Sequence, residues 1–220
     1  MSSGTAQWPS TPPRECPSDR TDELDGALVT EPTRALPDDA GPVLLAAARA
    51  AIAHDLGASA PPPPPWPEWA ETPLGTFVTL TQRGQLRGCI GTLTARVPVR
   101  EDVTANAVHA ARHDPRFPPM TADELDGTHI EVSVLSRAEP MAVTTEDEAL
   151  AALRPGVDGV IFAAAGRQST FLPQVWEQLP DPATFLSHLR AKAGLASSYW
   201  GPDVRLSRYT VQAWHEPDPA

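Results

Sequence analysis

Phe77-Val78-Thr79-Leu80-Thr81-Gln82-Arg83-Gly84-Gln85-Leu86-Arg87-Gly88-Cys89-Ile90-Gly91 (residues 77–91) is the stretch that decides the fold. Its first five residues are β-formers that alternate between two faces, which is typical of a strand with one buried face. Arg83-Gly84 then interrupts the pattern, and a second strand over 86–93 follows. Two strands joined by so short a glycine-containing link predict a β-hairpin.

Helical signals lie on both sides of this hairpin. Gly41-Pro42 precedes an alanine-rich segment that ends at Gly57, and acidic residues occupy the first turn of the segment after the hairpin. Thr121-Ala122-Asp123-Glu124 has the pattern of a capping box at the start of a short helix. The sequence therefore predicts helices over residues 43–56, 99–112, 145–153 and 181–194, with a short helix from Thr121.

Further strands are predicted from alternation. In residues 129–135, Ile130, Val132 and Val134 share one face, so Glu131 and Ser133 are expected to face away from the core. A hairpin is predicted over 160–165 and 167–171 with its turn at Gly166, and the last strand is predicted as one element over 204–214. Hairpins interrupted by helices predict an α+β fold with a largely antiparallel sheet flanked by helices and a smaller subdomain beside it.

Composition divides the chain into parts. Residues 1–40 are rich in Pro, Ser, Thr, Asp and Glu, which predicts a disordered acidic tail. Residues 41–216 are expected to form the folded domain, with a proline-rich spacer over 60–72 inside it, and residues 217–220 a short tail. The spacer is expected to favour polyproline II, either as a semi-rigid surface loop or as a ligand for a partner's aromatic groove.

Charge and hydropathy exclude several functions. The formal net charge is −11, from 28 acidic and 17 basic residues, which disfavours nucleic acid as a partner. No apolar run is long enough to span a membrane, and no secretory signal is recognisable, so a cytoplasmic location is expected. Cys16 and Cys89 do not suggest a disulfide framework, and Cys89 is expected to be a free thiol.

Two glycines bracket Cys89 inside a predicted strand, which is the most unusual local feature of the sequence. Glycine in a strand usually marks a bulge or a close approach to the backbone, so Gly88 and Gly91 predict that some group approaches here. One alternative is a ligand or partner. The other is structural, with Cys89 a small buried hydrophobe and the glycines admitting a neighbouring helix.

The segment Leu86-Arg87-Gly88-Cys89-Ile90-Gly91-Thr92 resembles the signature of the AMMECR family, whose prokaryotic members are called AmmeMemoRadiSam system protein A. Further matches follow in the family's order over about residues 43–216. They are Asp114-Pro115-Arg116-Phe117-Pro118-Pro119, Glu124-Leu125, Ile130 to Leu135, Gly156 to Val160, Thr170 to Trp176, Phe185-Leu186, Lys192 to Leu195, and Trp200. The acidic tail and the proline spacer are not part of the family pattern.

The resemblance implies a fold and a genomic context. It implies an antiparallel sheet flanked by helices, a smaller subdomain, and the cysteine motif near a cleft between them. It also implies a Memo-like protein, similar to extradiol dioxygenases, and a radical S-adenosylmethionine protein as partners. The resemblance does not imply a particular catalytic activity, so the rival hypothesis of a non-catalytic adaptor stays open.

A catalytic hypothesis makes Cys89 the nucleophile, with its thiolate favoured by Arg87 or Arg116. Glu131 or His129 would then serve as the base. Whether the protein is an enzyme is left open by the sequence.

A binding hypothesis uses overlapping residues. Arg87, Arg116 and Arg167 would donate hydrogen bonds to a small anionic ligand, and Gly88 and Gly91 would let it approach the backbone. No metal site is predicted, because His109 and His113 share a helix face without a third ligand. No cofactor is predicted either, since the sequence has no glycine-rich dinucleotide or Walker-type loop.

Overall fold

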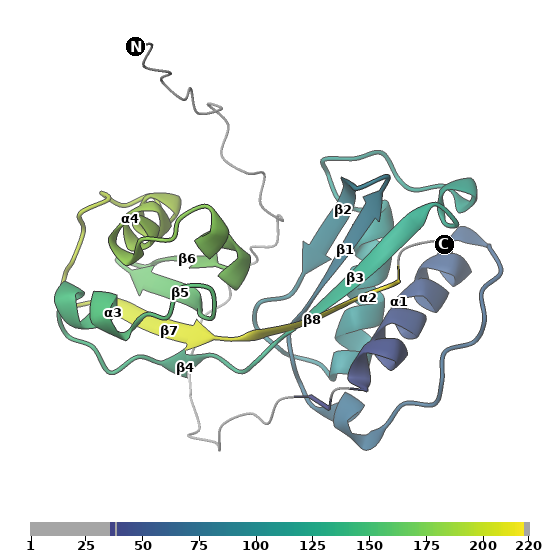
Figure 1. The fold of residues 1–220 in the computed structure, drawn as a ribbon, viewed down its shortest axis with the longest axis horizontal. Coiled ribbons are helices and arrows are strands. Elements are labelled where there is room, and N and C mark those ends of the chain that lie inside the picture. The colour runs from purple at the N-terminus through teal and green to yellow at the C-terminus, as the bar shows by residue number, and fades with distance from the viewer. Residues whose placement is uncertain (1–35, 38, 218–220) are drawn as a thin grey trace, which may run out of the picture.

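The computed structural model describes residues 36–37 and 39–217, which form two lobes (Figure 1). Each lobe contains a four-stranded antiparallel sheet, in the orders β2-β1-β3-β8 and β4-β7-β5-β6. The predicted α+β class is confirmed. The expectations for residues 1–35 and 218–220, which include the disordered tail, lie outside the described residues.

The first sheet is built on the predicted hairpin. Its strands are β1 (Thr76–Gln82), β2 (Gln85–Gly91), β3 (Thr128–Leu135) and β8 (Val211–His215). Arg83 and Gly84 join β1 to β2 with φ angles of 50° and 72°. Two consecutive positive φ angles make a two-residue turn of the kind whose twist matches that of the strands. The turn predicted at these two residues is confirmed.

Two helices cover one face of this sheet. They are α1 (Ala40–Leu56) and α2 (Val99–Arg112). Ile130, Val132 and Val134 of β3 are buried in the same core cluster as these helices, so the predicted inward face of β3 is confirmed. The helix α1 begins before residue 43, because Ala40 is fully buried and its amide donates to the carbonyl of Pro37.

The spacer after α1 is only partly a surface loop. Pro61 to Pro65 are exposed, but Trp66 and Trp69 pack against the first core cluster. Trp69 lies in the 3-10 helix η1 (Glu68–Glu71). Large aromatic side chains bury much apolar surface, so these two tryptophans anchor the proline-rich segment to the first lobe.

The second lobe holds the remaining elements. They are β4 (Glu139–Pro140), α3 (Glu146–Ala152), β5 (Gly159–Ala164), β6 (Arg167–Phe171), the 3-10 helix η3 (Pro173–Glu177), α4 (Pro182–Lys192) and β7 (Arg205–Tyr209). Its core includes Trp176 stacked on Phe185 with ring centroids 3.7 Å apart. The helix η3 carries Trp176 into this core, and the sequence had not predicted that element.

The last strand is two strands and not one. Residues 204–214 were predicted as a single element, but β7 belongs to the second sheet and β8 to the first. The break is at Thr210, whose amide donates to Ser136 Oγ while its carbonyl accepts from the amide of Ser136. Figure 1 shows β7 and β8 following one another across the two lobes. No glycine or proline separates β7 from β8, so the sequence carries no turn signal at the change of sheet.

Candidate functional site

A β-bulge shapes the motif strand. Leu80 pairs with Gly88 and Thr81 pairs with Leu86, so Arg87 is an extra residue without a partner on β1. A bulge bends the strand and re-aims the side chain of the extra residue. Arg87 is only 9% exposed, and its guanidinium binds the carboxylate of Glu124 with Nε–Oε1 and Nη2–Oε2 distances of 2.8 and 3.2 Å.

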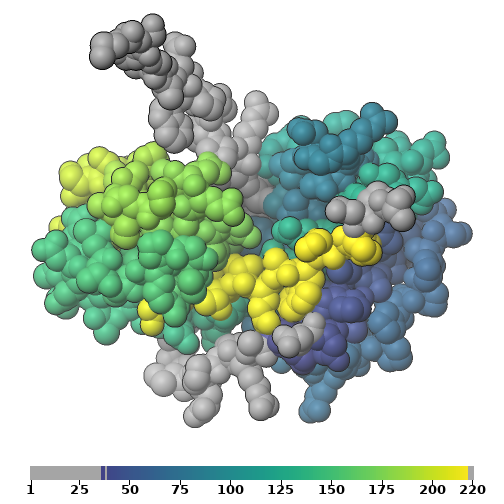
Figure 2. Space-filling model, viewed as in Figure 1, coloured from purple at the N-terminus to yellow at the C-terminus, as the bar shows by residue number. Residues whose placement is uncertain are grey.

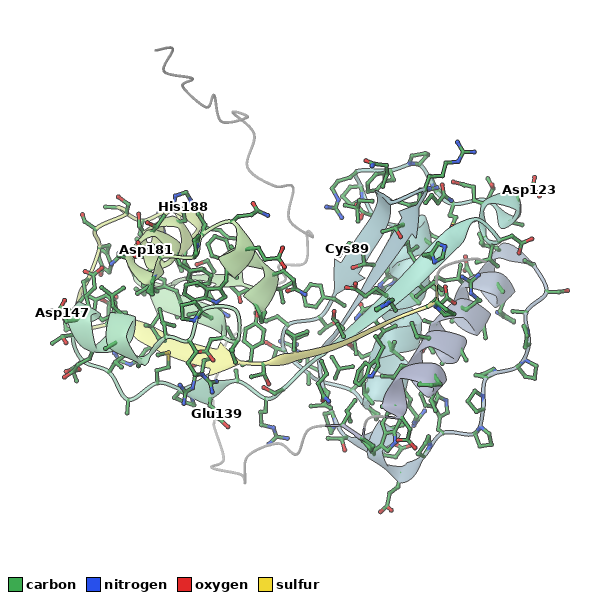
Figure 3. The ribbon with its side chains drawn as sticks, in the orientation of Figure 1. Cys89, Asp123, Glu139, Asp147, Asp181 and His188 are labelled. Carbon is green, nitrogen blue, oxygen red and sulfur yellow. The ribbon has the colours of Figure 1, made fainter. Side chains whose placement is uncertain are left out.

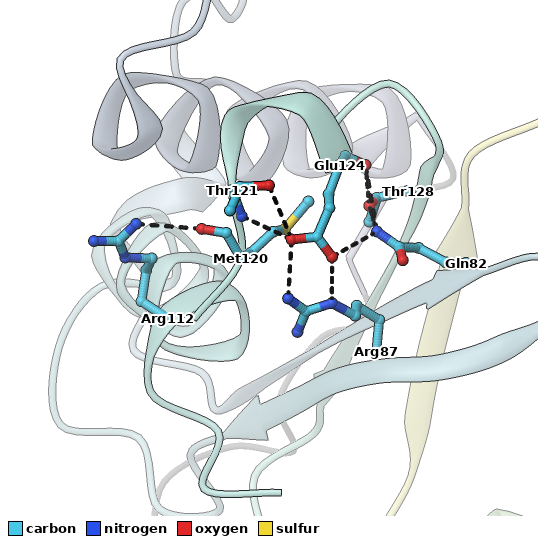
Figure 4. Close-up of polar contacts among 7 residues, drawn as sticks. All are labelled: Gln82, Arg87, Arg112, Met120, Thr121, Glu124 and Thr128. Atoms are coloured by element: carbon cyan, nitrogen blue, oxygen red, sulfur yellow. Dashed lines mark hydrogen bonds and ion pairs between the residues drawn. The ribbon is translucent and has the colours of Figure 1, made fainter. Parts of the chain in front are cut away.

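Glu124 is the centre of a polar network (Figure 4). It ends the 3-10 helix η2 (Ala122–Glu124) and accepts hydrogen bonds from the amide and hydroxyl of Thr121, which confirms the predicted capping box. Gln82 donates to the same carboxylate. The hydrogen bond from Arg87 is the main reason that the pKa of Glu124 falls to about 2. The arginine is therefore held inside the chain by a carboxylate that is charged at neutral pH.

The two glycines of the motif are approached by the protein itself. A Cβ at Gly88 would overlap the carbonyl oxygen of Ala110 in α2, and a Cβ at Gly91 would overlap the ring of Phe77. The close approach predicted at both positions is present. At Gly88 the approaching group is the neighbouring helix α2, which packs directly on the strand as the structural alternative predicts.

Asp114 and Arg116 clamp the outer edge of β2. The carboxylate of Asp114 accepts from the amide of Cys89 at 2.8 Å, and Nη2 of Arg116 donates to the carbonyl of Cys89 at 3.2 Å. The same Nη2 lies 2.6 Å from Asp114 Oδ2. Because β2 is an edge strand, these side chains occupy backbone groups that would otherwise be open to another strand.

Burial alone would raise the pKa of the Asp114 carboxyl. Hydrogen bonds from Arg116 and from the amide of Cys89 outweigh burial and hold that pKa below its ordinary value. Asp114 is 3% exposed, so the clamp is a buried, charge-assisted unit.

A row of polar side chains crosses the face of the first sheet that α1 and α2 leave uncovered. Thr79 pairs with Cys89 on β2 and with Glu131 on β3, and Glu131 pairs with His215 on β8. Directly paired residues project from the same face of a sheet. We call Cys89, Thr79, Glu131 and His215 the polar row. Figure 3 places Cys89 on the side of the first lobe that looks toward the second.

The members of the polar row differ in their surroundings. Thr79 Oγ1 lies 3.5 Å from Cys89 Sγ, and both residues are partly buried. Glu131 is partly buried as well, and within the described part of the chain its carboxylate makes no hydrogen bond or ion pair. His129, two residues before it, lies on the same face of β3. The expected outward orientation of Glu131 is confirmed.

Cys89 differs from its prediction. It is disulfide-bonded in the structure, so the expectation of a free thiol is wrong. The prediction for Cys16 lies outside the described residues. The sequence gave no reason to expect this, because a disulfide depends on spatial proximity, which the sequence does not display.

An apolar cluster adjoins the polar row and joins the two lobes. Phe77 and Leu135 of the first sheet are buried together with Ile161 and Tyr209 of the second, and Cys89 packs against this cluster. Ser133, which pairs with Phe77, is 5% exposed although it faces away from the helices. The second lobe therefore covers one end of the open face, and the polar row lies at the margin of that contact.

The predicted site residues are not all brought together. Cys89, Glu131 and His129 share one face of the first sheet, whereas Arg116 contacts the backbone and not the sulfur of Cys89. Arg87 is turned to Glu124. Arg167 lies in the second lobe and donates to the carbonyl of Gly194, just after α4.

His109 and His113 form an exposed edge-to-face pair on and just after α2, with ring centroids 5.5 Å apart. Among residues 36–37 and 39–217, no three His, Cys, Asp or Glu side chains are placed to hold a metal ion. Within the same ranges, no helix has the length and apolar character needed to cross a bilayer.

Three residues of the site were missed in the sequence. The sequence indicates Asp114 only as a family match, Glu124 as a family match and a capping-box residue, and Thr79 only as part of a strand. For Asp114 the signal was Arg116, two residues later in the same motif. Glu124 is 37 residues from Arg87, so the sequence gave no signal for that pair. Thr79 could be found only from the strand register, which places it between Cys89 and Glu131.

The fold and this face define a two-lobed α+β protein in which a short motif is clamped at the edge of a sheet beside a polar row. The chain belongs to the AMMECR1 family, whose model matches residues 45–214. It is 37% identical over 182 residues to a protein from Methanothermobacter thermautotrophicus, covering 81% of this chain and 95% of that one.

Two further similarities support the assignment. Protein MK0488 from Methanopyrus kandleri is 37% identical over 186 residues, covering 81% of this chain and 89% of its own length. The crystal structure of the uncharacterized protein PH0010 from Pyrococcus horikoshii has a TM-score of 0.71 and 33% identity, and it covers 82% of this chain and 93% of that one. The family resemblance predicted from the motifs is confirmed.

Proposed function

We propose that this protein is the A component of an AmmeMemoRadiSam-type system and that it binds a small molecule on the polar row. Membership of the AMMECR1 family supports the first part. The Memo-like and radical S-adenosylmethionine partners are inferred from the family resemblance. The observation that carries the binding proposal is the carboxylate of Glu131, which lies between Thr79 and His215 and has no partner among the residues that the structure describes.

The chemistry of the row defines the class of ligand. A carboxylate accepts hydrogen bonds, and each imidazole of His129 and His215 can donate or accept. A partly buried carboxylate without a partner is costly, so a group that donates to it is favoured. An ammonium or guanidinium group, or several hydroxyl donors, would satisfy Glu131. An apolar portion of the ligand would contact the cluster around Phe77.

A small anionic ligand has less support than the sequence suggested. Each arginine expected to bind it has an acceptor inside the chain: Glu124 for Arg87, Asp114 for Arg116, and the carbonyl of Gly194 for Arg167. An anion at the polar row would also be repelled by Glu131. Phosphate is therefore the negative control, because the proposal predicts that it does not bind the polar row.

Catalysis by Cys89 remains a separate prediction. Its disulfide would have to be reduced by a dithiol before the sulfur could act as a nucleophile. Arg116 contacts the carbonyl of Cys89, so this contact orients the strand and does not reach the sulfur. Ligand binding does not require a free thiol, which favours it over catalysis by Cys89.

The test is a titration of the full chain with agmatine, which carries both an ammonium and a guanidinium group, with inorganic phosphate in parallel. Binding is followed by calorimetry in the wild type and in Glu131→Gln, with Glu139→Gln on the exposed strand β4 as the matched control. Loss of a charge-assisted hydrogen bond is worth about 1.5–3 kcal/mol, so Glu131→Gln should weaken agmatine binding by roughly 10-fold to 150-fold. Equal affinities in the wild type and Glu131→Gln would contradict the proposal, as would binding of phosphate alone.

One observation favours the adaptor as a second candidate function. The contacts of Arg87, Gly88 and the Cys89 backbone are all made within the chain, which is what a structural pivot requires. The two candidates separate in a co-purification experiment with the neighbouring gene products. If the protein is an adaptor, the Glu131→Gln and Cys89→Ser variants should both retain the partners. If it is a ligand-dependent component, the Glu131→Gln variant should lose the function of the system.

A further inference from the structure

The two edges of the first sheet are finished in different ways. At the β2 edge, Asp114 and Arg116 occupy the outward amide and carbonyl of Cys89. At the other edge, β8 pairs with β3 on one side only. Proteins usually blunt an exposed edge strand with charged side chains, proline or a bulge. The sequence Val-Gln-Ala-Trp-His of β8 has no permanently charged residue and no proline, and its register with β3 is unbroken.

The outward backbone groups of β8 belong to Val211, Ala213 and His215. The amide of Glu216 donates to the carbonyl of Ile130, so every second residue before Glu216 also directs its backbone groups toward β3. The residues between them direct theirs away from the sheet. In the described part of the chain, no hydrogen bond reaches these outward groups. Figure 2 shows β8 in yellow at the surface of the molecule.

A groove of about 560 Å³ lies beside this edge, between α1, β8 and the start of the proline-rich segment. Its walls are mainly apolar and include Pro42, Leu45 and Trp214. Arg49 and Glu216 also line the groove, and they form an ion pair with an Nη2–Oε2 distance of 2.5 Å. The two charges of this pair cancel. The edge and its groove are therefore a neutral surface on a chain whose formal charge is −11 and whose copies repel one another elsewhere.

The edge is complementary to itself. Its outward groups come from the first, third and fifth residues of β8, so they are arranged symmetrically about Ala213. If two such strands lie antiparallel across a two-fold axis at Ala213, each Val211 stands opposite a His215, and up to about six main-chain hydrogen bonds form. Ala213 faces its own copy at the axis, and its side chain is small and uncharged.

We propose that two copies of the chain pair through β8 and join their first sheets into one continuous sheet. In this register Trp214 stands opposite Gln212 of the second copy, on the side of the groove. Gly41 has no side chain, so the ring of Trp214 packs directly on α1 and is half-buried within one chain. The second copy covers the rest of this ring. Tryptophan is enriched among the residues that contribute most to protein interfaces.

Sedimentation velocity of the full chain tests for this dimer. The interface is small, so we expect a Kd in the micromolar range and a series of concentrations from about 1 to 200 μM. The buffer should hold about 0.15 M salt, which screens the repulsion between two acidic chains. The wild type should shift from monomer to dimer over this series.

Two variants place a charge on the axis. Ala213→Lys and Ala213→Asp change an exposed residue, and each sets like charges opposite one another in the dimer. Each variant alone should dimerise at least about 10-fold more weakly than the wild type. An equimolar mixture of the two should recover the dimer, because the introduced lysine then meets the introduced aspartate. Ala105→Lys and Ala105→Asp, on an exposed position of α2, are the matched controls and should dimerise like the wild type.

Three results would overturn the proposal. The first is a wild type that stays monomeric over the whole series of concentrations. The second is a dimer that Ala213→Lys leaves unchanged, which would assign the contact to another surface. The third is a mixture of Ala213→Lys and Ala213→Asp that dimerises no better than either variant alone, which would exclude a two-fold axis at Ala213. Thermal unfolding of each variant shows that a loss of dimer is not a loss of fold, since an exposed substitution should leave Tm nearly unchanged.

Discussion

Replacing Asp114 with asparagine tests whether the clamp on β2 stabilises the fold. The Asp114 side chain is 1% exposed and accepts from the amide of Cys89, and from the amide, Nε and Nη2 of Arg116. Asparagine keeps one carbonyl oxygen, but it turns an NH₂ group toward donors. Arg116 keeps the carbonyl of Cys89 as an acceptor and loses its carboxylate.

The magnitude follows from the burial of this pair. Removing one partner of a buried ion pair costs about 3–5 kcal/mol, and the lower end applies because the side chain of Arg116 is 12% exposed. A free energy of unfolding of about 5–15 kcal/mol would therefore fall by roughly 3 kcal/mol. For a protein of this size 1 kcal/mol lowers Tm by about 2–4 °C, so Tm should fall by roughly 6–12 °C.

Urea unfolding and calorimetry measure this change, with Asp123→Asn as the control. Asp123 is an exposed aspartate in η2, and its replacement should alter stability by no more than about 0.5 kcal/mol. If Asp114→Asn lay equally close to the wild type, the reasoning about the clamp would be refuted. The double variant Asp114→Leu with Arg116→Met adds a check, because removing both charges should cost less than the sum of the single changes.

Two further predictions concern the rest of the motif. The pKa of Glu124 is lowered from 4.5 to about 2, so the stability contributed by its pair with Arg87 should be complete above about pH 5 and lost as the pH falls to 2. Glu124→Gln should remove that part of the acid dependence when urea unfolding is measured at a series of pH values. At pH 7 the variant should lose about 1–2 kcal/mol of unfolding free energy, a modest amount because the Glu124 side chain is 30% exposed. An unchanged dependence of stability on pH between 5 and 2 would argue against the pair. Gly88→Ala should cost about 1–3 kcal/mol, because its Cβ meets the carbonyl of Ala110. Gly127→Ala should change little, because a Cβ there makes only an ordinary contact, 3.9 Å from the carbonyl oxygen of Glu124. Thermal unfolding compares the two variants. Equal Tm values would mean that α2 can shift away from the added Cβ without loss of stability.

Much of the fold was predictable because the signals were local. The turn at Arg83-Gly84, the capping box at Thr121 and the inward face of β3 each depend on a few neighbouring residues. Local signals are also why the bounds of α2 were predicted correctly. The change of sheet at Thr210 was missed, because it depends on where Ser136 lies, a residue far away in the sequence.

The candidate site was predictable in its residues but not in its geometry. Cys89 and Glu131 were named from the sequence, and the register places them on either side of Thr79. The three arginines were expected to gather around a ligand. Each instead has an acceptor inside the chain, since partners such as Glu124 come from segments whose proximity only the folded chain creates.

The sequence by itself determined the α+β class, the central hairpin and the family, because these depend on periodicity, turn chemistry and ordered motifs. Only the tertiary structure decided that Gly88 admits α2, that Asp114 clamps the backbone of Cys89, and that Glu131 has no hydrogen-bond or ion-pair partner in the described residues. The physical reason is that hydrogen bonds and packing act between groups that are close in space. A motif shows which groups are present, and the fold selects which of them meet.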